Sequence, residues 1–300
     1  MNLTPVGAAG PLLTWLKIIA ATLALLALGA CSALRIGYGQ APNLIYWWID
    51  GYADLNDSQS AQIRSDIDRF MAWHRSQELP RYAALLKRWQ DMAQHNVTAE
   101  AVCRQYDDLR EAWVRMAEHA GAPLARLAVQ LDATQMAHFE RHQHKSHESF
   151  EKDFLRGSPE QRLNRRTERL LDRYETLYGP LSREQEALVR QGLARSPFDP
   201  QQTQQERLRL AAELRDMIRQ WQALPPGATR QTVKERAAGE WLAHRLPPRQ
   251  ATDHPTARVI RHGCEVYAAL HNSTTPEQRA HSVRVLRDYE TDIRSLAGQD

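Results

Sequence analysis

The chain has 300 residues, with 39 basic and 36 acidic side chains and a formal net charge of +3 at pH 7. This near balance gives no reason to expect binding to nucleic acid or to an anionic surface through bulk charge, and no basic patch with interleaved aromatic residues argues for nucleic acid. The sequence also lacks the common motifs for nucleophilic serine, phosphate, dinucleotide and zinc chemistry, so an enzyme is the less favoured expectation.

The first thirty residues are typical of a bacterial export signal. One charged side chain, Lys17, precedes the apolar run 18–28, which ends at the small residues Gly29 and Ala30. Eleven helical residues span about 16 Å, roughly half the hydrocarbon thickness of a bilayer. We therefore expect residues 1–30 to be a cleaved signal peptide and not a membrane-spanning helix.

The stretch Leu28-Gly29-Ala30-Cys31 resembles a bacterial lipobox. The resemblance implies cleavage before Cys31, lipid on its thiol and acylation of the new amine, which together give a stable anchor. Ser32 follows the cysteine in place of the aspartate that retains family members at the inner membrane. We expect a lipid-anchored, periplasm-facing protein of the outer membrane, and the alternative is a plain signal peptide beside an unmodified cysteine.

Two further cysteines, Cys103 and Cys264, remain as a pair if Cys31 carries lipid. Each borders an apolar helical stripe, and the expected compartment permits disulfides. A bridge would close a loop of about 160 residues and contribute several kcal/mol in the chain-entropy picture. The alternative is two separate buried thiols.

From residue 56 onward, apolar residues recur at spacings of three and four, the period of amphipathic helices. One such stripe contains Leu210, Leu214, Met217, Trp221 and Leu224. We predict an all-α domain over residues 56–300, with roughly nine or ten helices forming antiparallel hairpins in an elongated bundle. The predicted breaks between helices are at Pro80, 121–123, 157–159, 179–180, 197–200, 225–227, 247–248 and Pro255.

Several helix starts share one pattern, a short polar residue three positions before a glutamine. This is the spacing of a capping box, in which each side chain bonds the backbone of the other residue. The pattern can mean no more than well-capped helices. Its five instances are Asn56 with Gln59, Asp132 with Gln135, Ser158 with Gln161, Ser182 with Gln185, and Thr275 with Gln278.

Residues 31–55 form the expected lipidated N-terminus and contain the most aromatic segment of the chain. Trp47, Trp48 and Tyr52 are candidates for a docking or partner surface. They could rest at the lipid headgroup level, as tryptophan and tyrosine do in interfacial belts. The favoured alternative is that Trp47 or Trp48 fills the beginning of the core and docks a short helix there.

Trp73 and His74 are the other candidates for a docking surface. We expect the first long helix to end here, with His74 complementing its negative C-terminal dipole. Trp73 is expected to pack inside a hairpin formed with the next helix.

The segment His138–Glu151 is the one part of the chain rich in metal ligands. On a regular helix, four of its side chains share one face and could hold zinc. A solvated polar face without metal is the favoured alternative. The four candidates are His144, His147, Glu148 and Glu151.

Two resemblances extend this interpretation. The motifs Trp47-Trp48-Ile49-Asp50-Gly51-Tyr52 and Trp73-His74-Arg75 resemble those of a family of proteobacterial outer-membrane lipoproteins of uncharacterised function, most densely over residues 31–90. Leu181-Ser182-Arg183-Glu184-Gln185 is similar to the Leu-Thr-x-x-Gln motif of the small helical periplasmic stress chaperones of the Spy and CpxP type. The second resemblance implies chaperone-like binding.

The leading hypothesis is a lipid-anchored periplasmic interaction or chaperone-like protein with protein partners and no enzymatic activity. A metal-binding enzyme or sensor and a structural factor of envelope assembly are the alternatives. A concave apolar surface rimmed with arginine would favour binding. A closed pocket with convergent histidines and carboxylates would favour catalysis.

Overall fold

The computed structural model describes residues 33–225, 227–251 and 254–298. The predicted signal peptide and the lipobox cysteine, Cys31, lie outside these residues. All regular structure in the described part is helical, so the all-α prediction is confirmed. None of the described helices has the combination of length and apolarity that crossing a membrane requires.

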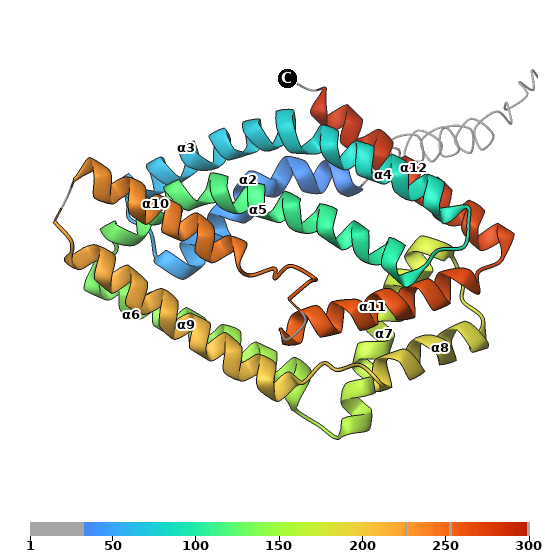
Figure 1. Cartoon of the computed structure of the whole chain (residues 1–300). Helices are drawn as coiled ribbons and strands as arrows, with labels where there is room; N and C mark the ends of the chain where they lie inside the picture. The colour runs from blue at the N-terminus through green and yellow to red at the C-terminus, as the bar shows by residue number, and fades with distance from the viewer. Residues whose placement is uncertain (1–32, 226, 252–253, 299–300) are drawn as a thin grey trace, which may run out of the picture. The chain divides into compact units, whose positions relative to one another are not determined.

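The chain divides into two compact units, Met1–Ala41 and Pro42–Asp300. The helix α2 (Ala33–Ala53) begins in the first unit and ends in the second. The second unit contains the aromatic part of α2 and all later helices (Figure 1).

The first break predicted within the domain, at Pro80, is wrong. Helices α3 (Asp57–Trp73) and α4 (Leu79–Ala93) are joined without a turn by a short π-helical segment, η1 (His74–Glu78), where the Leu79 N–H donates to the carbonyl of His74. Pro80 lies in the first turn of α4, where a proline is tolerated. The wider π turn lets the helix continue past the carbonyls that proline leaves unbonded.

The second predicted break, at residues 121–123, is also wrong, because α5 (Ala99–Gln130) passes straight through it. Gly121 serves a contact between helices: a Cβ atom there would lie 2.7 Å from the backbone nitrogen of Gly239 in α10 (Ala228–Ala243). Helix α10 packs closely along α5 at this crossing, and Trp113 Nε1 donates to the carbonyl of Leu242 at 2.8 Å. The glycine that suggested a loop is required by tertiary packing.

All five predicted capping boxes are confirmed, at the starts of α3, α6 (Ala133–Phe150), α7 (Pro159–Tyr178), α8 (Arg183–Ala194) and α12 (Pro276–Ala297). Four of the five glutamines also meet in pairs that the pattern did not predict. Gln59 bonds Gln135, and Gln185 bonds Gln278.

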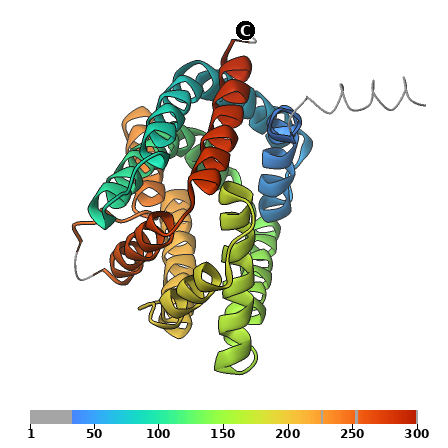
Figure 2. The ribbon, with the colours of Figure 1, turned by 90° about the vertical axis from the view of Figure 1, so that its right-hand side faces the viewer.

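The remaining elements are η2 (Glu151–Leu155), a π-helical extension of α6, then α9 (Pro200–Ala223) and α11 (Pro255–Asn272). Three antiparallel pairs organise the unit: α4 with α12, α5 with α10, and α6 with α9. Figure 1 shows α6 and α9 side by side, and Figures 1 and 2 both show α4 against α12.

Candidate binding groove

A groove of about 1130 Å³ lies in the second unit, walled mainly by α2, α5, α6, α9 and α10. Pockets for small molecules usually have volumes of roughly 300–1,000 Å³, so this one is large. Its apolar lining includes Leu127, Leu131, Phe139, Leu214, Met217 and Trp221. The sequence analysis had placed three of these, Leu214, Met217 and Trp221, on one helical stripe.

The floor of the groove is a packed apolar cluster shared by three helices. Ala128 of α5, Ile218 and Trp221 of α9, and Ala238 of α10 are all buried there. Small alanines on α5 and α10 let these helices approach, so that the larger α9 side chains complete the floor. Leu224, which the stripe had included, is 46% exposed beyond the end of α9.

A buried lysine of α10 binds the C-terminal end of α9. Lys234 of α10 is buried, and its Nζ donates to the carbonyl of Trp221 at 2.7 Å. This carbonyl belongs to the last turn of α9, where a positive charge meets the negative end of the helix dipole. The contact fixes α10 against the end of α9.

The other end of the groove is polar and cationic. Arg207 and Arg209 of α9 and Arg245, just after α10, line it together with one carboxylate, Glu206. Arg245 lies over the ring of Trp241, and burial lowers the pKa of its guanidinium. The arrangement gives the groove an apolar and a positively charged half.

The sequence analysis missed Arg207 and Arg245 as site residues. A signal was present, because Arg207 lies three residues before Leu210, and Arg245 lies four after Trp241. At these spacings helical residues share a face with the apolar lining. Charged residues at the edge of an apolar stripe are common on ordinary solvent-exposed helices, so the spacing alone did not single them out.

The four metal-ligand candidates have different surroundings in the described structure. His144 pairs with Glu148 at 3.3 Å on the exposed side of α6, whereas Glu151 begins the π-helical segment and accepts from Gln204. His147 lines the groove, and its pKa is lowered by burial and by the charge of Arg207. Within the described residues, no three histidine, cysteine or acidic side chains are grouped to hold a metal ion.

The aromatic candidates of α2 are mostly at the surface. Trp47 is 61% exposed and Trp48 is 63% exposed, so the favoured prediction that one of them fills the core is wrong. Tyr52 packs on α6, with its ring 4.0 Å from that of His142. The guanidinium of Arg64 lies over the ring of Tyr46. These contacts hold the end of α2 as one wall of the groove.

Trp73 and His74 lie away from the groove. Trp73 stacks on the ring of His119 in α5, with 3.6 Å between centroids, and not inside a hairpin. His74 is in the π-helical segment beside the rings of Phe70 and Tyr82. Burial lowers the pKa of His74, so it is neutral at pH 7 and does not supply the positive charge that we expected at a helix end.

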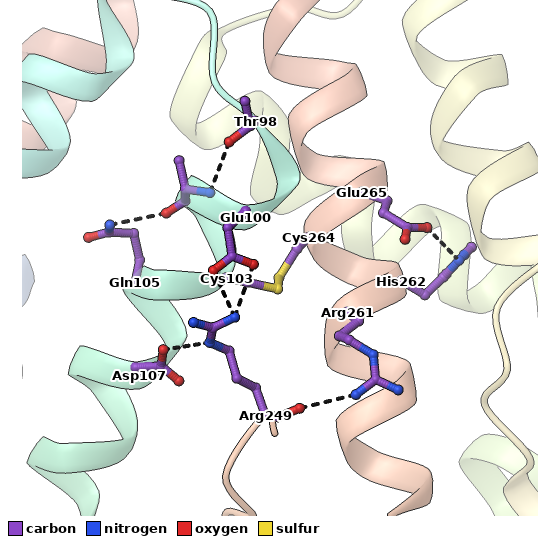
Figure 3. Close-up of a disulfide and its surroundings, with 11 residues drawn as sticks. Thr98, Glu100, Cys103, Gln105, Asp107, Arg249, Arg261, His262, Cys264 and Glu265 are labelled. Atoms are coloured by element: carbon purple, nitrogen blue, oxygen red, sulfur yellow. Dashed lines mark hydrogen bonds and ion pairs between the residues drawn. A yellow bond between two sulfur atoms is a disulfide. The ribbon is translucent and has the colours of Figure 1, made fainter. Parts of the chain in front are cut away.

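Cys103 and Cys264 are joined by a disulfide that links α5 to α11, with Cα atoms 5.5 Å apart. Figure 3 shows the bond between the two helices and Arg249 beside it. Arg249 bonds Asp107 at 2.6 Å and Glu100 at 2.9 Å, both on α5, and its carbonyl accepts from Arg261 of α11. The segment that follows α10 is therefore held to both helices that the disulfide joins.

These features define an all-helical protein built around an apolar groove with an arginine-rich end. Residues 51–230, more than half of the chain, match the model of a family of unknown function, DUF6279, and the chain belongs to that family. No curated protein and no solved structure matches the chain.

Proposed function

We propose that this chain is a lipid-anchored protein of the outer membrane, facing the periplasm, that binds apolar guests in a chaperone-like manner. The observation that carries the proposal is the large groove with its apolar floor and its arginine-rich end. Apolar surface on this scale, open to a guest, is characteristic of interaction sites.

Binding is favoured over catalysis because the polar groups around the groove do not converge. A catalytic site needs a nucleophile, base or metal held within hydrogen-bond reach of a partner. Here Arg209 pairs with Glu206 and Glu213, and His147 faces the positive charge of Arg207. The groove offers a surface for holding a guest and no arrangement for transforming one.

The membrane part of the proposal rests on the lipobox resemblance at Cys31 and on the exposed aromatic side chains of α2. Trp47 and Trp48 expose most of their surface on this helix, as does Leu44. Tryptophan is enriched at the lipid headgroup level. Acyl chains on Cys31 and an aromatic face on α2 would together keep the protein at the membrane surface.

A groove-filling variant tests the binding function. Ala211 lines the groove, so Ala211→Trp should fill part of it and reduce the suppression of aggregation of an unfolded model protein by the full chain. Leu208→Trp is the matched control, because Leu208 lies on the same helix, is 49% exposed and is not part of the lining. Absence of suppression by the wild type at equimolar ratio would refute the chaperone-like activity.

A separate experiment tests the location. Cys31→Ala should move the protein from the outer-membrane fraction to the periplasmic or unprocessed fraction. Wild-type protein that carries no lipid mass and fractionates without membranes would refute the anchor.

A further inference from the structure

We propose that the guest of the groove is an anionic phospholipid, with its acyl chains in the apolar half and its phosphate head group at Arg207 and Arg245. The inference rests on the proposed function and names the class of guest. It is argued from the distribution of apolar and charged side chains along the groove, from its length and from the pairing of its arginines.

The two halves of the groove differ in chemistry along α9. From Leu210 to Trp221 the lining side chains of this helix are apolar or alanine, whereas from Gln202 to Arg209 they are polar or charged. The antiparallel helix α6 follows the same order, with Phe139 at the apolar half and Ser146 and His147 at the polar half. A guest that fits both halves is an amphiphile with one apolar and one polar end.

The length of the apolar half matches an acyl chain. Leu210 and Trp221 are eleven residues apart on α9, which corresponds to about 16 Å along the helix axis. The hydrocarbon core of a bilayer is about 30 Å thick, so each leaflet contributes about 15 Å of chain. An acyl chain of a membrane lipid therefore spans this half from end to end, and the volume of about 1130 Å³ leaves room for more than one chain.

The charged half is lined by three arginines and one carboxylate, Glu206, so positive charge is in excess there. Arg209 is paired with Glu206 and Glu213. Among the described residues, the hydrogen bonds of Arg207 go to the neutral oxygens of Ser146, at 3.1 and 3.4 Å, and its guanidinium packs over the ring of Phe150. An anionic head group would supply the missing charge-assisted hydrogen bonds.

Arg245, the second arginine of the proposed head-group site, also lacks a direct ion pair in the described part of the chain. In the described part of the chain no carboxylate oxygen lies within 4.0 Å of it, and its contact is the Trp241 ring at 4.8 Å. Burial lowers the pKa of Arg245, since the groove wall separates the guanidinium from water. Glu206 and Glu213 attract Arg245 from beyond ion-pair distance, and both already pair with Arg209, so a phosphate at this position would give Arg245 a direct charged partner.

A lipid suits the walls of the groove better than an extended peptide does. An extended peptide carries an N–H and a C=O at every residue, and these need partners when they are buried. The walls are helices, whose backbone groups are already bonded within each helix and present no sheet edge for pairing. Acyl chains carry no such groups and need only apolar contact.

The test is retention of phosphatidylglycerol by the full chain purified in non-ionic detergent, measured as phospholipid phosphorus per protein after extensive washing. Wild type should retain close to one lipid per chain. The double variant Arg207→Gln, Arg245→Gln should retain about a hundredfold less, because two charge-assisted bonds are lost and each is worth roughly one order of magnitude. Arg219→Gln is the matched control and should retain the wild-type amount, since Arg219 lies on the same helix, pairs with Glu140 and Asp216 and is not part of the groove lining. Thermal melting of each variant checks that the fold is intact.

Other arms separate the possible outcomes. Zwitterionic phosphatidylcholine should be retained far less than phosphatidylglycerol, and Ala211→Trp should abolish retention. Retention of palmitate without phosphatidylglycerol, or equal retention in the double variant and wild type, overturns the phospholipid assignment. If no lipid is retained while the groove still suppresses aggregation, the inference fails and the proposed function stands. If both activities are absent, both fail.

Discussion

The side-chain amides of Gln59 and Gln135 hold each other by two hydrogen bonds, from Gln135 Nε2 to Gln59 Oε1 at 2.7 Å and from Gln59 Nε2 to Gln135 Oε1 at 3.2 Å. Each glutamine also accepts from the backbone N–H of its own N-cap residue. The capping boxes of α3 and α6 are thus joined into one buried polar contact, and Gln135 also donates to the carbonyl of Asp54 at the end of α2.

We predict that Gln135→Leu lowers the free energy of unfolding by about 2–4 kcal/mol, because it removes both hydrogen bonds to the buried Gln59 amide and the bond to the Asp54 carbonyl. Gln161→Leu is the control, since this glutamine makes the same local cap at an exposed position of α7. It should cost only about 0.5–1 kcal/mol. Urea denaturation measures both, and equal losses would show that the glutamine pair adds nothing beyond capping.

The crossing of α5 and α10 gives a second prediction. A side chain at Gly121 meets the backbone of Gly239, which cannot move aside as a side chain can. Gly121→Val should therefore push α10 from α5, destabilise the protein by about 2–4 kcal/mol and reduce guest binding in the groove. Gly263→Ala in α11 is the control, because nothing lies within 4 Å of the added Cβ. It should be neutral or stabilising by up to about 1 kcal/mol. A melting curve for each variant measures the change in stability.

The third prediction concerns Glu78, which is fully buried in the π-helical segment and bonds Arg115 at 2.7 and 2.9 Å and Arg81 at 2.6 Å. Burial alone would raise the pKa of this carboxyl, but the hydrogen bonds and charges of Arg115 and Arg81 outweigh it and lower the pKa below its ordinary value of 4.5. Glu78→Gln should cost about 3–5 kcal/mol at neutral pH, since it leaves the arginines facing an uncharged group.

The pH dependence of Glu78 has a definite sign. Because the folded pKa is lowered, its contribution to stability is fully present above the ordinary pKa and is lost as the pH falls through the folded value. Unfolding free energies measured from about pH 6 to about pH 3 should fall less steeply in Glu78→Gln than in the wild type. Asp108→Asn, which breaks the exposed pair with Arg88, is the control and should change stability by less than about 1 kcal/mol.

The fourth prediction concerns the disulfide. Cys103 and Cys264 are 161 residues apart, so reduction should lower the free energy of unfolding by up to about 5 kcal/mol in the chain-entropy picture. The Cys103→Ala, Cys264→Ala double variant should lose a similar amount and should no longer respond to reductant. Alkylation before and after reduction, read by mass, checks the bond, and two free thiols in periplasmic protein would contradict it.

The fifth prediction concerns α2. The double variant Trp47→Ala, Trp48→Ala should bind phosphatidylglycerol vesicles more weakly when tested with Cys31→Ala, in which the acyl anchor cannot mask the effect. Its melting temperature should change little, because both side chains are mainly exposed. Trp113→Ala is the contrast: it removes the bond to the carbonyl of Leu242 and should lower stability with no specific effect on vesicle binding.

The helical class, the capped helix starts and most helix boundaries could be predicted because they depend on residues close in sequence. The breaks predicted at Pro80 and Gly121 were wrong for one reason. Whether the helix continues through these residues depends on contacts with residues far along the chain. At Gly121 the partner is Gly239, and the π-helical turn before Pro80 contains the buried Glu78, whose partner Arg115 is on another helix.

The groove was predictable only in part. The apolar stripe of α9 could be recognised from the spacing of its apolar residues in the sequence. The cavity beside it exists because α2, α6 and α10 leave space along that stripe. Arg207 and Arg245 look like surface residues in the sequence, and only the fold shows that both line the same end of one groove. The capping glutamines were found, but their pairing requires two helix starts to meet in space.

The disulfide has a consequence for proteolysis. Nearly every side chain that lines the groove lies between Cys103 and Cys264, and the exceptions are the four from α2. Apart from α2, the helices that wall the groove therefore belong to one covalently closed ring. A protease that cuts the chain once anywhere inside this ring leaves both pieces attached to each other, so a nicked molecule keeps its complete set of groove helices.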